Sequence, residues 1–267
     1  MNTPAVPQPR ALPNLPRSTN ARATIIPAVV FLAIGLAWHF AVTLLKVPPI
    51  VLPGPAAVFD AIVEQRGLLL EAAISTLTEI VLATAIAVVA GFLTALAISI
   101  SPMVRRMVFP YILMTQVVPK VALAPILIAW FGIGMQSRLI LAFLIAYFPM
   151  VINSLAGLLG TNESSVRYAR SLAASELQIL LKVRFPAALP SIMSGIKITA
   201  GVAVIGIVVG EFVATDRGLG KVIIESTATM DTALTIAGVV IISALGLLVL
   251  GALEVIERHI VYWQPGR

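Results

Sequence analysis

The chain has no cysteine, only two histidines and few charged residues. Without cysteine there is no disulfide, no thiolate ligand for a metal and no thiol nucleophile. His39 and His259 lie far apart in the sequence, so metal and redox chemistry are not expected. Charged residues make up 11% of the 267 positions, against roughly 25% in an average soluble domain. With 59% hydrophobic residues as well, the composition excludes an ordinary soluble fold.

Long runs of uncharged residues make up most of the sequence. A helix that crosses a bilayer needs roughly 20 apolar residues. Four runs pass this test directly, namely 23–45, 80–104, 139–162 and 232–253. Two more, 107–137 and 185–210, pass if Lys120 and Lys197 are tolerated. The sequence therefore predicts an all-α integral membrane protein with six spans, whose connections are too short to hold a separate soluble catalytic domain.

Basic residues predict the orientation of these spans. If the N-terminus is cytoplasmic, eleven basic residues lie inside and five lie outside, which agrees with the positive-inside rule. The cytoplasmic segments are then 1–24, 101–106, 159–189 and 254–267. Five prolines and three arginines in residues 1–24 predict a disordered cytoplasmic tail. Residues 25–263 would form the six-helix domain, and residues 264–267 a short C-terminal tail.

Three charged residues within or next to the apolar runs are candidates for a solute path: Glu79, Lys120 and Glu211. Lys120 lies between Pro119 and Pro125, which interrupt helical hydrogen bonding. Irregular backbone at membrane depth is tolerated only where it packs on protein or lines a cavity. The alternatives are a lysine that snorkels to the membrane surface and glutamates that are simply interfacial.

Two smaller features concern packing. Prolines predict an extended stretch over residues 47–55, followed by an amphipathic helix over residues 56–70 that lies along the outer membrane surface. Gly206 and Gly210 have the four-residue spacing that lets two membrane helices approach closely. This spacing is common, and it indicates a packed bundle or a dimer without indicating a solute.

The segment 159–189 is the longest internal cytoplasmic connection, and its pattern predicts a helix, a tight break and a second helix. Thr161 or Asn162 can cap the first helix, and Ser175 with Gln178 forms a capping box for the second. Such a pair is suited to docking a soluble partner. The alternative is a basic loop that rests on anionic lipid headgroups.

At this loop the chain resembles a known family. Residues 169–175, with 183–192 and Gly195, resemble the cytoplasmic signature loop of inner-membrane permease subunits of binding-protein-dependent ABC importers. The likeness is strongest to the branch for nitrate, sulfonate and taurine. It extends over most of the chain through Leu52–Pro53–Gly54–Pro55, Trp130–Phe131–Gly132 and Phe148–Pro149.

The resemblance implies a type I importer-like homodimer in the bacterial inner membrane, with two ATPase subunits inside and an extracytoplasmic solute-binding protein outside. It assigns ATPase coupling to these residues: Arg167, Ala169, Leu172, Ala173, Ala174, Ser175, Pro186, Leu189 and Pro190. The chain is not expected to be an enzyme or to hold a cofactor, because Gly218–Leu219–Gly220–Lys221 lacks the flanking residues of a P-loop. ATP would be used by the partner subunits.

The loop departs from the family pattern at three positions. Arg167 stands where the family has its leading glutamate, Tyr168 where it has an alanine, and Ala173 where it has a glycine at the break. An altered ATPase partner is one consequence to consider. The cargo stays open between a small organic anion, which Lys120 would attract, and a heterocycle such as a pyrimidine or riboflavin.

Two other classes of protein remain alternatives. A stand-alone carrier driven by an ion gradient often shows internal repeats and broken helices, but the sequence shows no repeat and one strongly broken span. A membrane-embedded enzyme needs a nucleophile, an acid and a base together. Glu79, Lys120 and Glu211 are too scattered in the sequence to predict such a site.

Overall fold

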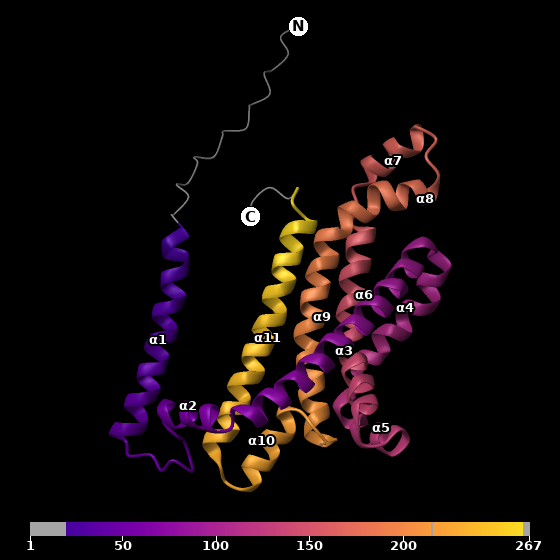
Figure 1. The fold of residues 1–267 in the computed structure, drawn as a ribbon. Coiled ribbons are helices and arrows are strands. Elements are labelled where there is room, and N and C mark those ends of the chain that lie inside the picture. The colour runs from indigo at the N-terminus through magenta and orange to yellow at the C-terminus, as the bar shows by residue number, and fades with distance from the viewer. Residues whose placement is uncertain (1–19, 215, 264–267) are drawn as a thin grey trace.

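A computed structural model describes residues 20–214 and 216–263, and within these ranges the chain is helical with no strand (Figure 1). The α-helices are α1 Asn20–Leu44, α2 Pro55–Glu64, α3 Arg66–Ile100, α4 Pro102–Val117, α5 Ala124–Phe131, α6 Met135–Leu159, α7 Glu163–Ser171, α8 Glu176–Ile179, α9 Phe185–Val213, α10 Leu219–Ala228 and α11 Thr232–Ile260. A 3₁₀ turn, Lys120–Leu123, precedes α5, and a π-helical turn, Leu180–Arg184, joins α8 to α9.

Each of the six predicted spans overlaps a helix or a bent pair of helices, but the structure supports only four or five of them as spans. Four segments are long and apolar enough to cross a membrane by themselves: Arg66–Ile100, Met135–Leu159, Glu176–Val213 and Thr232–Ile260. A fifth span is possible only if α4 and the segment Lys120–Phe131 are taken together, although they are bent by 83°. The apolar part of α1, Val29–Leu44, is shorter than the other spans. The all-helical membrane fold is thus confirmed.

Small residues build the centre of the bundle, where α6 packs mainly on α9 and α3. Alanines from all three helices are fully buried there, including Ala83, Ala142 and Ala203. Because lipid tails give helices no hydrophobic reason to associate, close packing of small side chains stabilises such contacts. A Cβ on Gly206 would lie 2.7 Å from the Cα of Ala142. The Gly206 and Gly210 pair therefore serves the α6–α9 contact within one chain.

The connections gather at two opposite ends of the bundle (Figure 1). Helices α7 and α8, the α3–α4 junction, the start of α1 and the end of α11 lie toward one end, here called the coupling end. Helices α2, α5 and α10 lie toward the other, here called the outer end. The described parts of the basic segments predicted to share one side of the membrane therefore lie toward the same end.

Some boundaries differ from the expectations. The amphipathic helix predicted over 56–70 ends at Glu64, since Gln65 leaves helical geometry and Arg66 already begins the long α3. Residues 20–24, predicted as part of a disordered tail, belong to α1. The remainder of that tail, residues 1–19, and the C-terminal tail, residues 264–267, lie outside the described residues.

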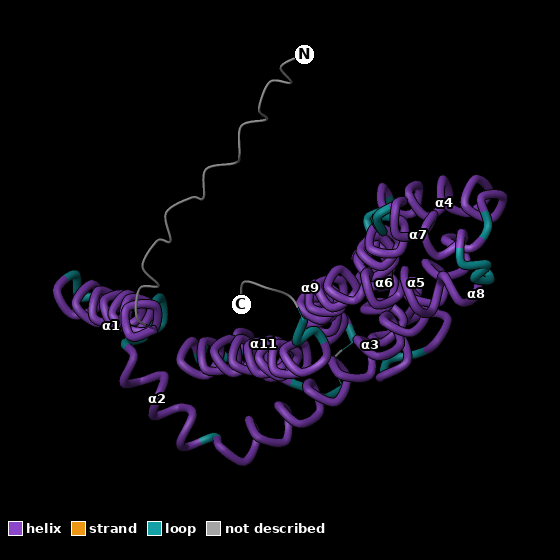
Figure 2. Tube along the Cα trace, turned by 90° about the horizontal axis from the view of Figure 1, so that it is seen from above, coloured by secondary structure: helices purple, strands orange, loops and turns teal. Residues whose placement is uncertain are grey.

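Helix α1 stands apart from the other spans in both views (Figure 2). Its indole at Trp38 donates a hydrogen bond from Nε1 to the carbonyl oxygen of Pro53, at 3.1 Å. Trp38 also packs at the edge of an outer-end apolar cluster that contains Val58 and Leu219. The connection 45–54 and helix α2 thus hold the outer end of α1.

Candidate functional site

An ion pair joins α3 to α6 at the outer end. Arg138 is fully buried, and Glu79 is 2% exposed. The guanidinium donates from Nε to Glu79 Oε2 at 2.8 Å and from Nη2 to Glu79 Oε1 at 2.5 Å. This paired, two-bond geometry is the strongest way for arginine to hold a carboxylate. The buried charge of Glu79 is therefore paired with that of Arg138.

The same arginine reaches the segment after α9. Its Nη1 donates to the carbonyl oxygen of Ala214 at 2.8 Å and to the carboxylate of Asp216. Burial alone would raise the pKa of Asp216, but the hydrogen bond and positive charge of Arg138 hold that pKa below its usual range. Arg138 thus fastens three separate segments of the chain at the outer end.

Glu211 organises a second polar centre beside the first. It is fully buried near the end of α9. Its Oε1 accepts a hydrogen bond from Thr76 Oγ1 at 2.7 Å, and its Oε2 accepts one from the Gly220 amide at 2.6 Å. Thr76 Oγ1 in turn accepts from the Leu219 amide at 2.9 Å. Both amides belong to the first turn of α10, where a negative charge is favoured by the helix dipole.

The glycines of this turn are required by Glu211. Gly218 has φ +100°, a region that side chains rarely adopt, and a Cβ there would collide with the carboxylate of Glu211. A Cβ on Gly220 would lie 2.5 Å from Glu211 Cβ. The sequence 218–220 is therefore explained by close packing around a buried carboxylate rather than by phosphate binding.

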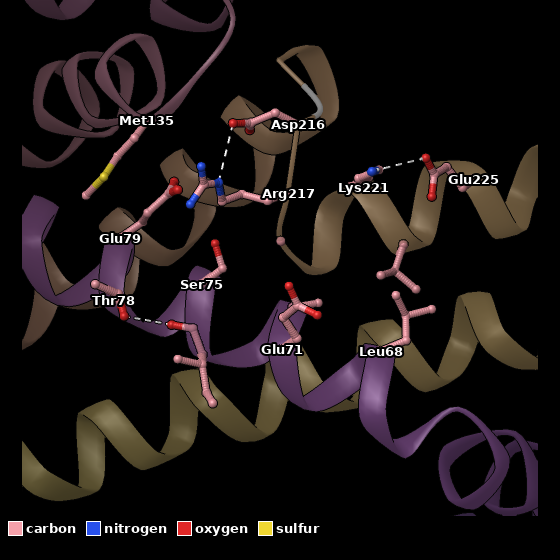
Figure 3. Close-up of a pocket in the computed structure, with 14 residues that line it drawn as sticks. Leu68, Glu71, Ser75, Thr78, Glu79, Met135, Asp216, Arg217, Lys221 and Glu225 are labelled. Atoms are coloured by element: carbon pink, nitrogen blue, oxygen red, sulfur yellow. Dashed lines mark hydrogen bonds and ion pairs between the residues drawn. The ribbon is translucent and has the colours of Figure 1, made fainter.

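A cavity of about 680 Å³ opens next to these two centres (Figure 3). Helix α3 lines one side with Leu68, Glu71, Ser75, Thr78 and Glu79, and the α9–α10 connection with α10 lines the other with Asp216, Arg217, Lys221 and Glu225. Arg217 pairs with Asp216 at 3.4 Å, and Lys221 pairs with Glu225 at 3.6 Å. The cavity wall therefore combines apolar side chains with charged groups of both signs.

Lys120 does not join these centres. It begins the 3₁₀ turn in the bend between α4 and α5, and its Nζ donates to Gln116 Oε1 at 3.2 Å. The prolines predicted a kinked span, and the structure has a sharp bend of 83° at this place. The three predicted path residues therefore divide into two buried network carboxylates and one partly exposed lysine.

The predicted helix pair of the coupling end is present. Asn162 Oδ1 accepts from the Ser164 amide at 2.8 Å and caps α7. Ser175 and Gln178 form the predicted capping box of α8, with hydrogen bonds of 3.3 and 2.9 Å. Arg170 on α7 also pairs with Glu176 on α8 at 2.9 Å. Each short helix thus has its own local cap, and an exposed ion pair joins the two.

The break between these helices places an alanine where the resemblance expects glycine. Ala173 has φ +58°, in the left-handed region that favours glycine. Its amide donates to the carbonyl oxygen of Arg170 at 2.9 Å, and the Ala174 amide donates to that of Ala169 at 3.2 Å. The backbone therefore forms a glycine-type turn in spite of the alanine side chain.

The predicted coupling residues lie in two environments. Helix α7, the break and the start of α8 hold six of them: Arg167, Ala169, Leu172, Ala173, Ala174 and Ser175. The other three, Pro186, Leu189 and Pro190, lie in the first turns of α9 instead. Tyr168, Leu172 and Leu177 are 68%, 65% and 64% exposed. The projecting helix pair thus presents large apolar side chains that the chain itself does not cover.

Sequence reasoning missed Arg138, Asp216 and Thr76. Arg138 was counted only as a basic residue on the outer side. The available signal was that Glu79 and Arg138 each lie at the outer end of an apolar run, where opposite charges at equal depth tend to pair. Among the described residues, no group of three or more histidine, aspartate or glutamate side chains is placed to hold a metal ion.

The comparisons with known proteins decide the family. Residues 87–262 match the family of binding-protein-dependent transport system inner membrane components. The chain belongs to this family.

Curated relatives agree with this assignment. A probable ABC transporter permease protein of Haemophilus influenzae is 35% identical, over 83% of this chain and 90% of its own length. The taurine transport system permease protein TauC of Escherichia coli is 32% identical, over 85% of each chain. The formylaminopyrimidine transport permease protein ThiX of Halalkalibacterium halodurans is 28% identical, over 89% of this chain and 95% of its own. The chain is therefore an ABC importer permease subunit.

A solved structure of an ABC importer has a similar fold. A chain of the MetNI methionine ABC transporter, solved in inward-facing conformations, superposes with a TM-score of 0.66 at 20% identity, covering 74% of this chain and 98% of the other. At this identity the likeness concerns the fold alone. The importer permease fold expected from the resemblance is confirmed.

Proposed function

We propose that two copies of this chain form the solute path of an ATP-driven importer, with both termini in the cytoplasm. Two ATPase subunits would dock on α7 and α8, and a solute-binding protein would deliver its ligand at the outer end. The observation that carries this proposal is the projecting helix pair with its exposed Tyr168, Leu172 and Leu177.

The charge distribution supports the orientation. Arg105, Arg167, Arg170 and Arg184 all belong to segments of the coupling end. Basic residues next to spans are retained on the cytoplasmic side of the membrane. An ATPase that uses cytoplasmic ATP would therefore meet the helix pair on the correct side.

The helical path supports a coupling role for the pair. The segment Glu176–Val213 runs from α8 through the π-helical turn into α9 as one candidate span. At its far end lies Glu211, which holds the first turn of α10 through Gly220. A force on α8 would thus reach the wall of the outer cavity through one stiff helical element, without a flexible linker between them.

The outer cavity and Lys120 are the proposed places of solute contact. The cavity of about 680 Å³ offers hydroxyl, carboxylate and basic groups, which suits a small polar solute. Taurine and formylaminopyrimidine, named for the relatives, are the two substrate classes that we propose to test. The bend at Lys120 adds a positive charge that would attract an anion.

The coupling role is tested by placing a charge in the helix pair. Ala169→Asp, or a deletion of 171–178, should lower ATP-coupled uptake in proteoliposomes by at least about tenfold, since a buried or contact-face charge costs several kcal/mol. Protein yield and elution on size exclusion should stay normal. Ser164→Asp adds the same charge at the exposed start of α7 and should transport normally. Normal uptake by the Ala169→Asp variant would disprove the docking role.

The identity of the cargo is tested through the partners. Gentle purification of the tagged chain followed by mass spectrometry should recover a P-loop ATPase in stoichiometric amount, and a co-purified binding protein can then be titrated with taurine and with formylaminopyrimidine. If the chain purifies alone and moves solute in liposomes without ATP, the chain acts as a secondary carrier and the proposal is wrong.

A further inference from the structure

Two adjoining cavities lie behind the helix pair at the coupling end. The larger, about 540 Å³, lies between the α3–α4 junction and α8. The smaller, about 340 Å³, lies between the end of α6 and α7. Leu159, Arg170 and Arg184 line both cavities, so the two adjoin each other, and together they are here called the arginine pocket.

Positive charge dominates the arginine pocket. Its four arginines come from three separate elements, namely α4 with Arg105, α7 with Arg167 and Arg170, and the π-helical turn with Arg184. Two glutamates, Glu163 and Glu176, also line it, and Glu176 forms an ion pair with Arg170. Within residues 20–214 and 216–263, the other three guanidinium groups have no carboxylate within ion-pair distance, although Arg184 is half-buried. The pocket therefore has donors for an anion that this chain does not supply.

The remaining wall is apolar and continues into the membrane-spanning part. Ile98 and Ile100 end the long span α3, and Leu180, in the π-helical turn, lines the same cavity. Ile100 is 62% exposed. A ligand that filled this space would need an anionic group beside the arginines and hydrocarbon along α3. A phosphate-bearing lipid has both parts, whereas free phosphate would leave the apolar wall uncovered.

We propose that the arginine pocket binds the phosphate headgroup of an acidic phospholipid. Arginine is suited to this because its planar fork donates two hydrogen bonds to phosphate oxygens. Basic pockets between spans at the cytoplasmic surface are a recurrent place for such headgroups. The bound lipid would bridge the α3–α4 junction and the α7–α8 pair and so restrain the position of the coupling helices. This inference goes beyond the proposed function and needs only that the coupling end lies at a membrane surface.

The test counts retained lipid rather than transport. The full chain is stripped of lipid in detergent, mixed with equal amounts of phosphatidylglycerol or phosphatidylcholine vesicle lipid, and examined by native mass spectrometry. Wild type should retain phosphatidylglycerol in preference to phosphatidylcholine. Each of Arg105→Gln and Arg184→Gln should lower that retention by about fivefold, the effect of one basic residue near a headgroup.

A matched pair of substitutions separates the pocket from general surface charge. Arg106→Gln and Lys182→Gln remove the same charge from positions one and two residues away, respectively, that do not line the pocket. They should retain wild-type amounts of phosphatidylglycerol. Since Arg105 is exposed at the start of α4, its variant should fold even if the Arg184 variant does not.

Three outcomes would overturn the proposal. Equal loss of lipid in the pocket and control variants would mean that only general surface charge attracts the lipid. Equal retention of phosphatidylglycerol and phosphatidylcholine would mean that the headgroup charge is not recognised. Binding of inorganic phosphate at millimolar concentration without retained phosphatidylglycerol would assign the pocket to a free anion instead. None of these outcomes depends on the ATPase or on solute, so failure here leaves the proposed function standing.

Discussion

The two ends of the molecule are held together in opposite ways. At the outer end, buried charges and hydroxyls bridge residues far apart in the chain, as between Arg138 and Glu79 or between Thr76 and Glu211. At the coupling end, the helix pair is fixed by hydrogen bonds between near neighbours, as between Ser175 and Gln178. The structure of the outer end depends on the packing of the whole bundle, and that of the helix pair depends on a few adjacent residues.

This contrast suits different tasks. Removing one member of a buried ion pair leaves an uncompensated charge, which destabilises the whole fold. The exposed caps of α7 and α8 contribute to local order, and their loss should leave the bundle intact. We therefore expect substitutions at the outer end to act on stability and substitutions at the coupling end to act on the use of ATP.

The largest effect is expected at Arg138. Arg138→Met leaves the buried carboxylate of Glu79 unpaired and should lower the free energy of unfolding by about 3–5 kcal/mol. Denaturant titration of the protein in mixed micelles measures the change. The exposed Arg66→Met should change it by less than about 0.5 kcal/mol.

A double variant sharpens this result. Glu79→Gln with Arg138→Met removes both charges, so it should recover part of the loss in the single variant. If Arg138→Met unfolds at the wild-type denaturant concentration, the ion pair does not hold the outer end, and the contrast between the two ends fails.

A smaller effect is expected at Glu211. In Glu211→Gln only one oxygen remains to accept hydrogen bonds, so either Thr76 Oγ1 or the Gly220 amide loses its acceptor. An unsatisfied buried donor costs about 1–3 kcal/mol, to be read from the same titration. Glu225→Gln removes an exposed carboxylate from the same cavity wall and is the matched control. An equal effect of both substitutions would show that burial of Glu211 is unimportant.

The same contrast explains what could be predicted from sequence. The caps of Asn162 and Ser175 were predictable because each joins residues two or three positions apart. The spans were predictable because bilayer thickness sets their length. The Gly206 contact was predictable as a close approach, although the sequence did not name Ala142 as the partner.

The outer network could not be predicted in the same way. Thr76 and Leu219 lie 143 positions apart, and Arg138 and Asp216 lie 78 apart, so their contacts follow only from how α3, α6 and α9 pack. The early end of α2 was also missed, because the break falls at Gln65, whereas the nearby Gly67 already lies inside α3.

At the coupling end, the break offers a substitution that should stabilise. Ala173→Gly removes the steric cost of a left-handed alanine, roughly 1–2 kcal/mol, and part of that gain is offset by the greater backbone freedom of glycine. Amide hydrogen exchange over residues 163–179 should therefore slow by a few fold. Ala174→Gly brings the same added freedom to a residue without positive φ and should speed exchange instead. A change of the same sign in both variants would contradict the proposed strain.

The smallest effect concerns pH and Asp216, whose side chain is 32% exposed. Because Arg138 holds its pKa below the usual range, the charged carboxylate stabilises the fold fully above the ordinary value of about 3.9. That stabilisation is lost as the pH falls through the lower native pKa. The melting temperature of the wild type should therefore exceed that of Asp216→Asn at pH 7 and at pH 5, and this gap between the two melting temperatures should close below about pH 4. Exposed Asp60→Asn should show no gap at any of these pH values. A gap that persists unchanged at pH 3 would mean that Arg138 does not depend on the charge of Asp216.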